Sequence, residues 1–441
     1  MSSALSTIAV SPPQRLSAPA LDCRMSPHFS ASGSLSIRHG AWLEIDLSAL
    51  ASNARVMRRA IPGGTRLGIL VKANGYGHGL EMSARAALVG GADELIVAAL
   101  DEGLALRRAG LTAPILVVYP IEPEGVGEAV EARLELSVSG GASTRRLLEA
   151  WATRQASGPQ RMLRLHVEVD TGMGRGGVAE EGLVEVVGLI DAAPATELVG
   201  IWSHLADGGD AQGSAEQAQR FEAAVARLAA TGRPIPPRHL VATEGIFVAT
   251  APAYEMVRVG LGYYGELGLG VDPAPAYRAL AAELRPVMRV KARPVRLERM
   301  SPGATVGYGR EWTAERESVV ATLPIGYADG WTRAYWPGAW ALVRGRRAPL
   351  IGRVSMDSVC ADVTDVAASG EITLEDEFVL LGSQGSERIT ANELARLRRS
   401  ITNEVFCAFG PRLPRVYLDE SGVVAVAQGG EGLESAPGAR W

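Results

Sequence analysis

The sequence predicts an α/β protein in which a (β/α)8 barrel is followed by a second, mostly β domain. Two observations lead to this prediction. Over the first two thirds of the chain, short apolar runs alternate with amphipathic segments that often end in Gly. After about Leu280, the apolar runs are separated by Gly and Pro turns instead. Apolar runs that alternate with helices are typical of parallel strands buried on both faces.

The barrel prediction depends on eight apolar runs. From Ala41 the sequence becomes globular, and Asp46 stands where it can cap the first amphipathic helix. The runs expected as strands are LGILV (67–71), ELIVAAL (94–100), ILVVY (115–119), LELSV (134–138), LRLHVEV (163–169), LVGIWSH (198–204), HLVA (239–242) and MVRVG (256–260). Eight strand–helix units of this kind fit one closed barrel over residues 41–280.

The remaining segments differ in composition. Residues 281–425 are predicted to be mostly β, interrupted by a helix that begins with the capping-box pair Thr390 and Glu393. Residues 1–40 are rich in Ser, Pro and Ala and are expected to be disordered. Because they hold few acids, an organellar transit peptide is an alternative. Residues 426–441 are expected to form a flexible tail.

Composition excludes several classes of protein. The 441 residues are 47% apolar and 21% charged, with a net charge of −5 and both signs interspersed. No basic stripe indicates nucleic-acid binding, and no apolar run reaches the ~18 residues that span a bilayer. The three cysteines are scattered without metal-ligand spacing, which favours a reducing cytoplasmic compartment and argues against a metal centre.

Candidate site residues, most of them polar, follow most of the predicted barrel strands, at the end where barrel active sites lie. They are Lys72 and Tyr76 after the first run, Arg175 after the fifth, His204 at the end of the sixth, Thr243 after the seventh, and Arg258, Gly260 and Leu261 on and after the eighth. Thr243 and the amides of Gly260 and Leu261 suit an anion, because loops after the last two barrel strands often bind phosphate. A lone histidine at a strand end is more often structural, whereas a buried Arg258 requires polar partners.

The predicted β domain holds three short motifs. These are VGYGRE with Tyr308, GYADG with Tyr327, and GRVSMD with Met356 and Asp357. Tyr308 lies between two glycines, so its phenol would stand on a thin loop. Taken alone, this motif indicates an exposed turn tyrosine.

Together these segments resemble the alanine racemase family. The marks are VKANGYGHG, VDTGMGR, WSH, RVGLGYYG, VGYGRE, GYADG and GRVSMD, in the family's order and spacing between about residues 41 and 425. The resemblance implies a barrel that binds pyridoxal 5′-phosphate and is fused to a β domain. It also implies an enzyme that interconverts L- and D-alanine, and a homodimer whose active sites are shared between subunits.

The resemblance further implies a role for each marked residue. Lys72 is the Schiff-base lysine, and Tyr308, contributed by the opposite subunit, is the second catalytic base. The cofactor phosphate is surrounded by Tyr76, Thr243, Gly260, Leu261 and Asn403. Arg258 contacts the ring nitrogen of the cofactor, and His204 lies between Arg258 and the catalytic tyrosine. The substrate is bound by Arg175, Met356, Asp357 and Tyr327. Two bases are needed because racemisation removes a proton from one face of the α-carbon and returns one to the other.

Three positions depart from the family. Glu168 stands where many members have a carbamylated, anionic lysine, so a permanent carboxylate would orient Arg175 without carbon dioxide. Asn403 takes the place of a tyrosine that narrows the substrate pocket, and Ala242 the place of an asparagine. These changes leave the reaction type alone and open the choice of substrate. A serine or broad-specificity racemase is therefore the alternative.

Other functions are less compatible with the sequence. Decarboxylases of the same two-domain type usually carry a glutamate at the ring nitrogen, where this chain has Arg258. Non-catalytic pyridoxal-phosphate carriers resemble the barrel alone, and the second domain with Tyr308 argues against that class. A barrel without cofactor would lack a visible absorption band.

Overall fold

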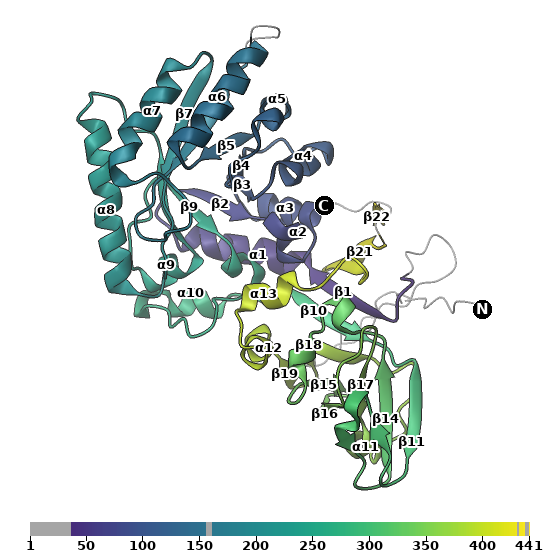
Figure 1. Ribbon diagram of the computed structural model, residues 1–441. Coiled ribbons are helices and arrows are strands. Elements are labelled where there is room, and N and C mark those ends of the chain that lie inside the picture. Colours follow the sequence, from purple (N-terminus) through teal and green to yellow (C-terminus); the bar gives the residue numbers. More distant parts are fainter. Residues whose placement is uncertain (1–36, 156–160, 430–431, 437–440) are drawn as a thin grey trace. The chain divides into compact units, whose positions relative to one another are not determined.

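The computed structural model describes residues 37–155, 161–429, 432–436 and 441. The chain divides into two compact units (Figure 1). One is Ala49–Arg285, called the barrel unit below. The other, the β unit, joins the described residues up to Ser48 with those from Pro286 onward.

The barrel unit contains a closed barrel of eight parallel strands, which confirms the predicted fold class. The strands are β2 (Arg66–Leu70), β3 (Glu94–Val97), β4 (Ile115–Val117), β5 (Glu135–Val138), β6 (Leu163–Glu168), β7 (Thr196–Trp202), β8 (Arg238–Ala242) and β9 (Met256–Val259). Each predicted apolar run overlaps one of them. The barrel closes where β9 pairs with β2, with Arg258 beside Gly68.

Helices and short helical turns connect the strands, and the longer helices cover the outside of the barrel (Figure 1). They are α1 (Leu47–Arg59), α2 (Lys72–Tyr76), α3 (Leu80–Val89), α4 (Leu100–Arg108), α5 (Val126–Glu131), α6 (Gly141–Gln155), α7 (Leu183–Ala192), α8 (Ala211–Ala229), α9 (Thr243–Val248) and α10 (Arg278–Ala282). The longest, α8, shows why the sequence forms such helices. Asp210 caps it by accepting the Gln212 amide at 3.1 Å, and Phe221, Val225 and Leu228 form its buried stripe.

The β unit is mostly β, as expected. Its strands are β1 (Ala41–Asp46), β10 (Met288–Ala292), β11 (Arg296–Met300), β12 (Thr305–Val306), β13 (Trp312–Thr313), β14 (Ser318–Leu323), β15 (Trp340–Val343), β16 (Arg346–Ile351), β17 (Val359–Asp362), β18 (Phe378–Gln384), β19 (Glu387–Ile389), β20 (Arg415–Asp419), β21 (Gly422–Ala427) and β22 (Leu433–Ser435). Thr390 caps the expected helix α12 (Ala391–Leu397) by accepting the Glu393 amide at 3.0 Å. Two short helices, α11 (Thr364–Ala367) and α13 (Thr402–Cys407), were not predicted.

The domain boundaries differ from the predicted ones at both ends of the barrel. Strand β1 pairs with β10 and β20 of the β unit, so residues 41–48 do not belong to the barrel. Its six residues are all buried, and a fully buried strand carries no alternation that would reveal its sheet. The second boundary lies at Pro286 rather than 281. Strands β21 and β22 also occupy part of the predicted flexible tail. The predictions for residues 1–36 and 437–440 lie outside the described residues.

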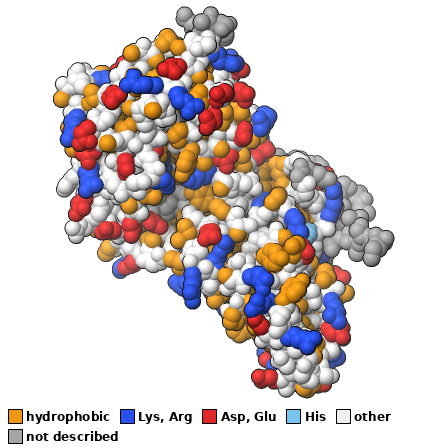
Figure 2. Space-filling view, viewed as in Figure 1, with side chains coloured by type: hydrophobic (Ala, Val, Ile, Leu, Met, Phe, Trp, Pro, Cys, Tyr) orange, Lys and Arg blue, Asp and Glu red, His pale blue; other side chains and the backbone are white. Residues whose placement is uncertain are grey.

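The surface carries charges of both signs, as the interspersed acidic and basic residues of the sequence suggest. Figure 2 shows acidic and basic side chains interspersed on the face in view. Among the described residues, no helix combines the length and the apolar character needed to cross a bilayer.

Candidate active site

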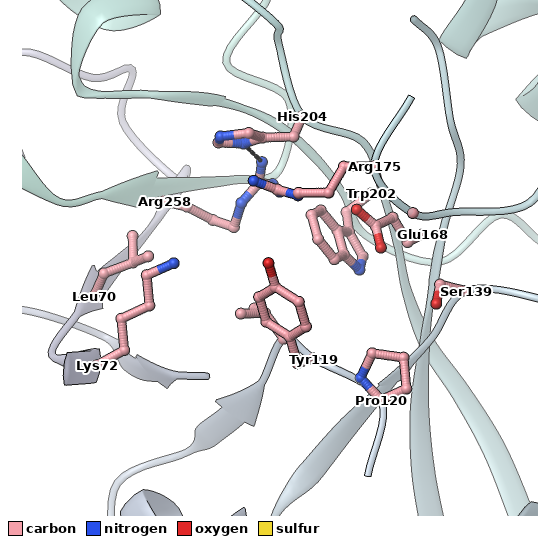
Figure 3. A pocket seen from close by; sticks show the side chains of 12 residues that line it. Leu70, Lys72, Tyr119, Pro120, Ser139, Glu168, Arg175, Trp202, His204 and Arg258 are labelled. Carbon is pink, nitrogen blue, oxygen red and sulfur yellow. Dashed lines mark hydrogen bonds between the residues drawn. The ribbon is translucent and has the colours of Figure 1, made fainter. Parts of the chain in front are cut away.

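A cavity of about 280 Å³ opens at the carboxyl ends of the barrel strands. Its lining includes five residues that the sequence singled out: Lys72, Glu168, Arg175, His204 and Arg258. Figure 3 shows the side chains of Lys72, Tyr119, Arg175 and Arg258 directed toward one shared space. Tyr119, Ser139 and Trp202 also line the cavity and were missed, because strand-end aromatic and hydroxyl residues carry no distinctive spacing.

Lys72 is followed by a left-handed turn of the backbone. Ala73, Asn74 and Tyr76 have φ values of 52°, 54° and 51°. For residues other than glycine, this conformation costs about 1–2 kcal/mol each. Backbone strain of this kind is typical of functional sites, where the surrounding structure maintains it.

Two side chains maintain the turn. Glu102 accepts the Ala73 amide at 2.6 Å through one carboxylate oxygen and the Ala98 amide at 2.9 Å through the other. Asn74 accepts the Leu80 amide at 2.9 Å. The sequence suggested a glycine loop here, but three non-glycine residues take the left-handed conformation because these hydrogen bonds compensate for it.

Four of the five residues expected around a phosphate, Tyr76, Thr243, Gly260 and Leu261, lie together beside this turn. Thr243 Oγ1 accepts the amides of Gly260 and Gly262, each at 3.2 Å. A Cβ added at Gly260 would lie 2.8 Å from the hydroxyl of Tyr76, and one added at Gly262 would lie 2.8 Å from Cγ2 of Thr243. Leu261 begins the 3-10 turn Leu261–Tyr264 between them. In this backbone cradle the two glycines leave no room for a side chain beside Tyr76 and Thr243, and the loops are those where barrels often bind phosphate.

Arg258 is buried among polar partners, as its place in an apolar strand suggested. Its side chain donates to the carbonyl oxygens of Ser203 (2.7 Å) and Leu240 (2.9 Å) and to the imidazoles of His204 (3.1 Å) and His239 (2.8 Å). Burial lowers the pKa of Arg258 to about 9, against the opposing charge of Glu168. The guanidinium therefore keeps its proton at neutral pH.

His204 is held neutral in this site. Burial, followed by the positive charges of Arg258, Arg175 and Lys72, lowers the pKa of His204 to about 3. Arginine only donates, so Nδ1 of His204 accepts the bond from Arg258 that is dashed in Figure 3. The neutral ring must then carry its proton on Nε2, which leaves that N–H as a donor.

Glu168 and Arg175 face the same cavity. Burial raises the pKa of Glu168, and the charges of Arg175 and Arg258 oppose that rise. Arg175 is exposed, and its guanidinium carbon lies 6.0 Å from the centre of the Tyr119 ring. No hydrogen bond links Glu168 to Arg175 in the part of the chain that the structure describes, so their interaction is through charge.

The remaining candidates lie in the β unit, where backbone contacts bring the three motifs together. A Cβ at Gly307 would lie 2.9 Å from the Arg353 amide nitrogen, and one at Gly326 would lie 2.3 Å from the Met356 carbonyl oxygen. The Tyr327 amide donates to Ser355 at 3.1 Å. Tyr308 is 67% exposed, as the glycines around it suggested.

Two further residues of the β unit have defined surroundings. The carboxylate of Asp357 accepts Arg412 at 2.8 Å, and the same guanidinium bonds buried Asp329. Asn403 is half-buried near the start of α13. Their predicted roles toward substrate and cofactor stay predictions.

A buried polar chain below Arg258 was missed by the sequence analysis. His239 bonds His166 at 3.0 Å, His166 bonds Glu135 at 2.8 Å, and Glu135 accepts Arg164 at 2.9 Å. Glu94 lies beside them, fully buried, with Arg66 at 3.5 Å. Polar residues inside the apolar runs ELIVAAL, LELSV, LRLHVEV and HLVA were the available signal, but their contacts depend on strand register.

Glu94 leads to a prediction about stability. Burial, with the charge of Glu135 as the second cause, raises the pKa of Glu94 from 4.5 to about 7. Between these values the folded chain holds a proton that the unfolded chain has lost, so stability falls as the pH rises. Full ionisation costs roughly 3 kcal/mol. Glu94→Gln should remove this loss and raise the melting temperature at pH 8 by several degrees, with little change at pH 5.

The control for this stability test is Glu122→Gln, since the Glu122 side chain is 85% exposed. Melting curves of the two variants and the unmodified chain at pH 5 and pH 8 provide the measurement. A Glu94→Gln variant with the same pH dependence as the unmodified chain would contradict the prediction.

Comparison with known proteins confirms the resemblance. Residues 45–267 match the family described as alanine racemase, N-terminal domain, and residues 287–417 match alanine racemase, C-terminal domain. The alanine racemase of Symbiobacterium thermophilum is 38% identical over 384 residues, covering 86% of this chain and 97% of that protein. Alanine racemase 2 of Bacillus subtilis is 36% identical over 391 residues, covering 88% and 96%.

Solved structures of racemases have a similar fold. Alanine racemase from Bacillus anthracis with bound L-Ala-P has a TM-score of 0.80 at 29% identity, covering 89% of this chain and 98% of that one. A histidine racemase from Leuconostoc mesenteroides has a TM-score of 0.76 at 27% identity, covering 86% and 98%. The barrel, the β unit and the lysine-bearing cavity thus define an isomerase of the racemase class. The chain belongs to the alanine racemase family.

Proposed function

We propose that this chain interconverts L- and D-alanine with pyridoxal 5′-phosphate, as a cytoplasmic homodimer. The observation that carries the proposal is the cavity that unites Lys72, Arg175, His204 and Arg258. Its support is the family membership, with curated relatives of 35–38% identity that are named alanine racemase. The 67% exposure of Tyr308 supports a role toward another subunit.

The residues present fit the cofactor. The cradle of Tyr76, Thr243 and Gly260 suits its phosphate, and the donor-only guanidinium of Arg258 suits its unprotonated ring nitrogen. When bound, the cofactor supplies a conjugated ring that acidifies the α-hydrogen of an attached amino acid. Lys72 is positioned on the rim of the same cavity.

The chain's own groups then divide the proton transfers. The amine of Lys72 takes or returns the α-proton on one face, and Tyr308 of the partner subunit serves the other. Arg175 binds the substrate carboxylate. Neutral His204 offers its Nε2 proton toward the tyrosine and bonds Arg258 on its other side, so a phenolate would be stabilised without a charged imidazole.

The proposal is tested by assaying a panel of L-amino acids for D-product, with added pyridoxal 5′-phosphate. L-Alanine is expected to give the highest kcat/KM. The Leuconostoc neighbour carries the name histidine racemase, so the panel includes serine and histidine. Faster turnover of serine than of alanine would favour the alternative, and Asn403→Tyr should then shift the preference back toward alanine. No turnover of any amino acid would refute the proposal.

Glu168 provides a second test. Its carboxylate places a negative charge beside Arg175 and lies within the cavity lining. Glu168→Gln should raise KM for L-alanine roughly five- to tenfold, the equivalent of about 1–1.4 kcal/mol, because Arg175 loses its compensating charge. Added bicarbonate should leave the unmodified enzyme unchanged. The matched control is exposed Glu181→Gln on the following segment. An unchanged KM in Glu168→Gln would count against this role.

A further inference from the structure

The hydrogen-bond chain inside the barrel has a defined direction. It begins at Arg258 beside the cavity and passes through His239 and His166 to Glu135, the first residue of β5. All four side chains are buried. The chain therefore joins the active-site end of the barrel to the opposite end of its strands.

Arg258 sets the direction in which the hydrogen bonds are donated, because a guanidinium can donate hydrogen bonds but cannot accept them. Nδ1 of His239 accepts from Arg258 at 2.8 Å, so a neutral His239 carries its proton on Nε2 and donates it to Nδ1 of His166 at 3.0 Å. By the same reasoning, His166 donates from Nε2 to Glu135 at 2.8 Å. Burial lowers the pKa of both imidazoles, which is consistent with two neutral rings.

The hydrogen-bond chain ends at an ionised carboxylate, that of Glu135. Burial opposes ionisation, but the bonds from His166 and Arg164 lower the pKa of Glu135 to about 2. Neighbouring Glu94 has two buried oxygens that accept no hydrogen bond from the described residues. Below about pH 7, burial keeps Glu94 as the neutral acid, so Glu135 carries the charge.

The same geometry argues against a metal ion at this end. The ligand atoms of Glu94, Glu135 and His166 lie within 4.8 Å of one another, a spacing that admits a cation. A metal would need the lone pair of His166 Nε2. With the hydrogen-bond direction set by Arg258, that nitrogen carries the proton donated to Glu135, so a metal ion would have to displace it.

We propose that Glu135 is a positioning residue for Arg258, which it holds in place and balances in charge through His166 and His239. This inference rests on the proposed function, in which Arg258 faces the ring nitrogen of the cofactor. A guanidinium buried at 3% exposure requires compensating charge. Glu168 supplies one negative charge from the cavity lining, and the hydrogen bonds through His239 and His166 link Arg258 to a second carboxylate outside the cavity. Loss of that charge should affect turnover more than substrate binding.

Glu135→Gln tests the inference, because it preserves the shape of the side chain and removes its charge. Its matched control is Glu197→Gln, since Glu197 also bonds Arg164, at 2.8 Å, but lies outside the chain and is 48% exposed. We expect kcat to fall roughly tenfold in Glu135→Gln with KM for L-alanine within about twofold, and no change in the control. Equal kinetics in the two variants would overturn the positioning role.

Nitrogen-15 NMR of the histidine rings gives a readout that needs neither activity nor cofactor. His166 and His239 should both carry the proton on Nε2 and should not titrate between pH 6 and 9, and the His239 signals should move in Glu135→Gln but not in Glu197→Gln. A proton on Nδ1 of either ring, or a ring that titrates in this pH range, would refute the proposed hydrogen-bond chain from Arg258 to Glu135. If Glu135→Gln does not fold, His166→Gln replaces it with the same expected fall in kcat.

These outcomes separate the two proposals. An unmodified enzyme that racemises no amino acid refutes the proposed function, while the NMR signals still report whether Glu135 is coupled to His239. An active enzyme whose His239 signals are the same in Glu135→Gln refutes the inference alone.

Discussion

Replacing Lys72 with alanine is expected to lower racemisation by at least about a thousandfold. The amine is proposed both to hold the cofactor and to transfer the proton on one face, so its loss removes covalent and acid–base catalysis together. The measurement is the rate of D-alanine formation with excess cofactor, together with the visible absorption band of the bound cofactor. That band should be lost or displaced in Lys72→Ala.

The chain offers an unusually clean control for this prediction, because it has two lysines, Lys72 and Lys291. Lys291 is paired with Glu44 at 2.8 Å and Glu377 at 3.2 Å in the β unit, so it is engaged elsewhere. Lys291→Arg should keep the absorption band and the activity. Borohydride trapping followed by peptide mass mapping should label Lys72. Label on Lys291, or full activity in Lys72→Ala, would disprove the assignment.

Tyr308→Phe is expected to lower kcat by about 10²–10⁴-fold, because phenylalanine keeps the ring and removes the proton-transferring oxygen. The KM for alanine should change far less. Tyr277→Phe in the barrel unit serves as the control, since Tyr277 packs against Phe247 and neither residue lines the cavity. A fall in rate that is equal in both variants would argue against a specific role for Tyr308.

Mixing the two inactive proteins tests whether active sites are shared. If Tyr308 acts on the barrel of the partner subunit, a mixed dimer of Lys72→Ala and Tyr308→Phe chains has one intact site. Random exchange makes half of the dimers mixed, so about a quarter of the unmodified activity should return. If each chain used its own tyrosine, no activity would return on mixing.

The barrel and most of its active-site candidates were predictable because they depend on local patterns. Apolar runs mark the strands, and the polar residues that follow them, such as Lys72 and Arg175, share one rim in any closed parallel barrel. The contacts between strands were not predictable. Glu135 and His166 are 31 positions apart in sequence and meet only because β5 and β6 pair in one particular register.

The turn after Lys72 shows a second limit. Its glycines indicated a loop, yet Ala73, Asn74 and Tyr76 adopt left-handed backbone angles that such residues seldom take. Glu102 stabilises that conformation from the next strand–helix unit. The local sequence does not predict these backbone angles, because a side chain 29 positions away from Ala73 stabilises them.

The placement of β1 has a consequence for synthesis on the ribosome. This strand is made early, but its partners β10 and β20 are made only after the whole barrel unit. At roughly 5–20 residues per second, an apolar segment that includes Trp42 and Leu43 waits for tens of seconds without its sheet. Stalled or truncated translation products that end within the barrel would therefore expose an apolar, aggregation-prone segment. Chaperones that bind unfolded chains should associate with these products at residues 41–46.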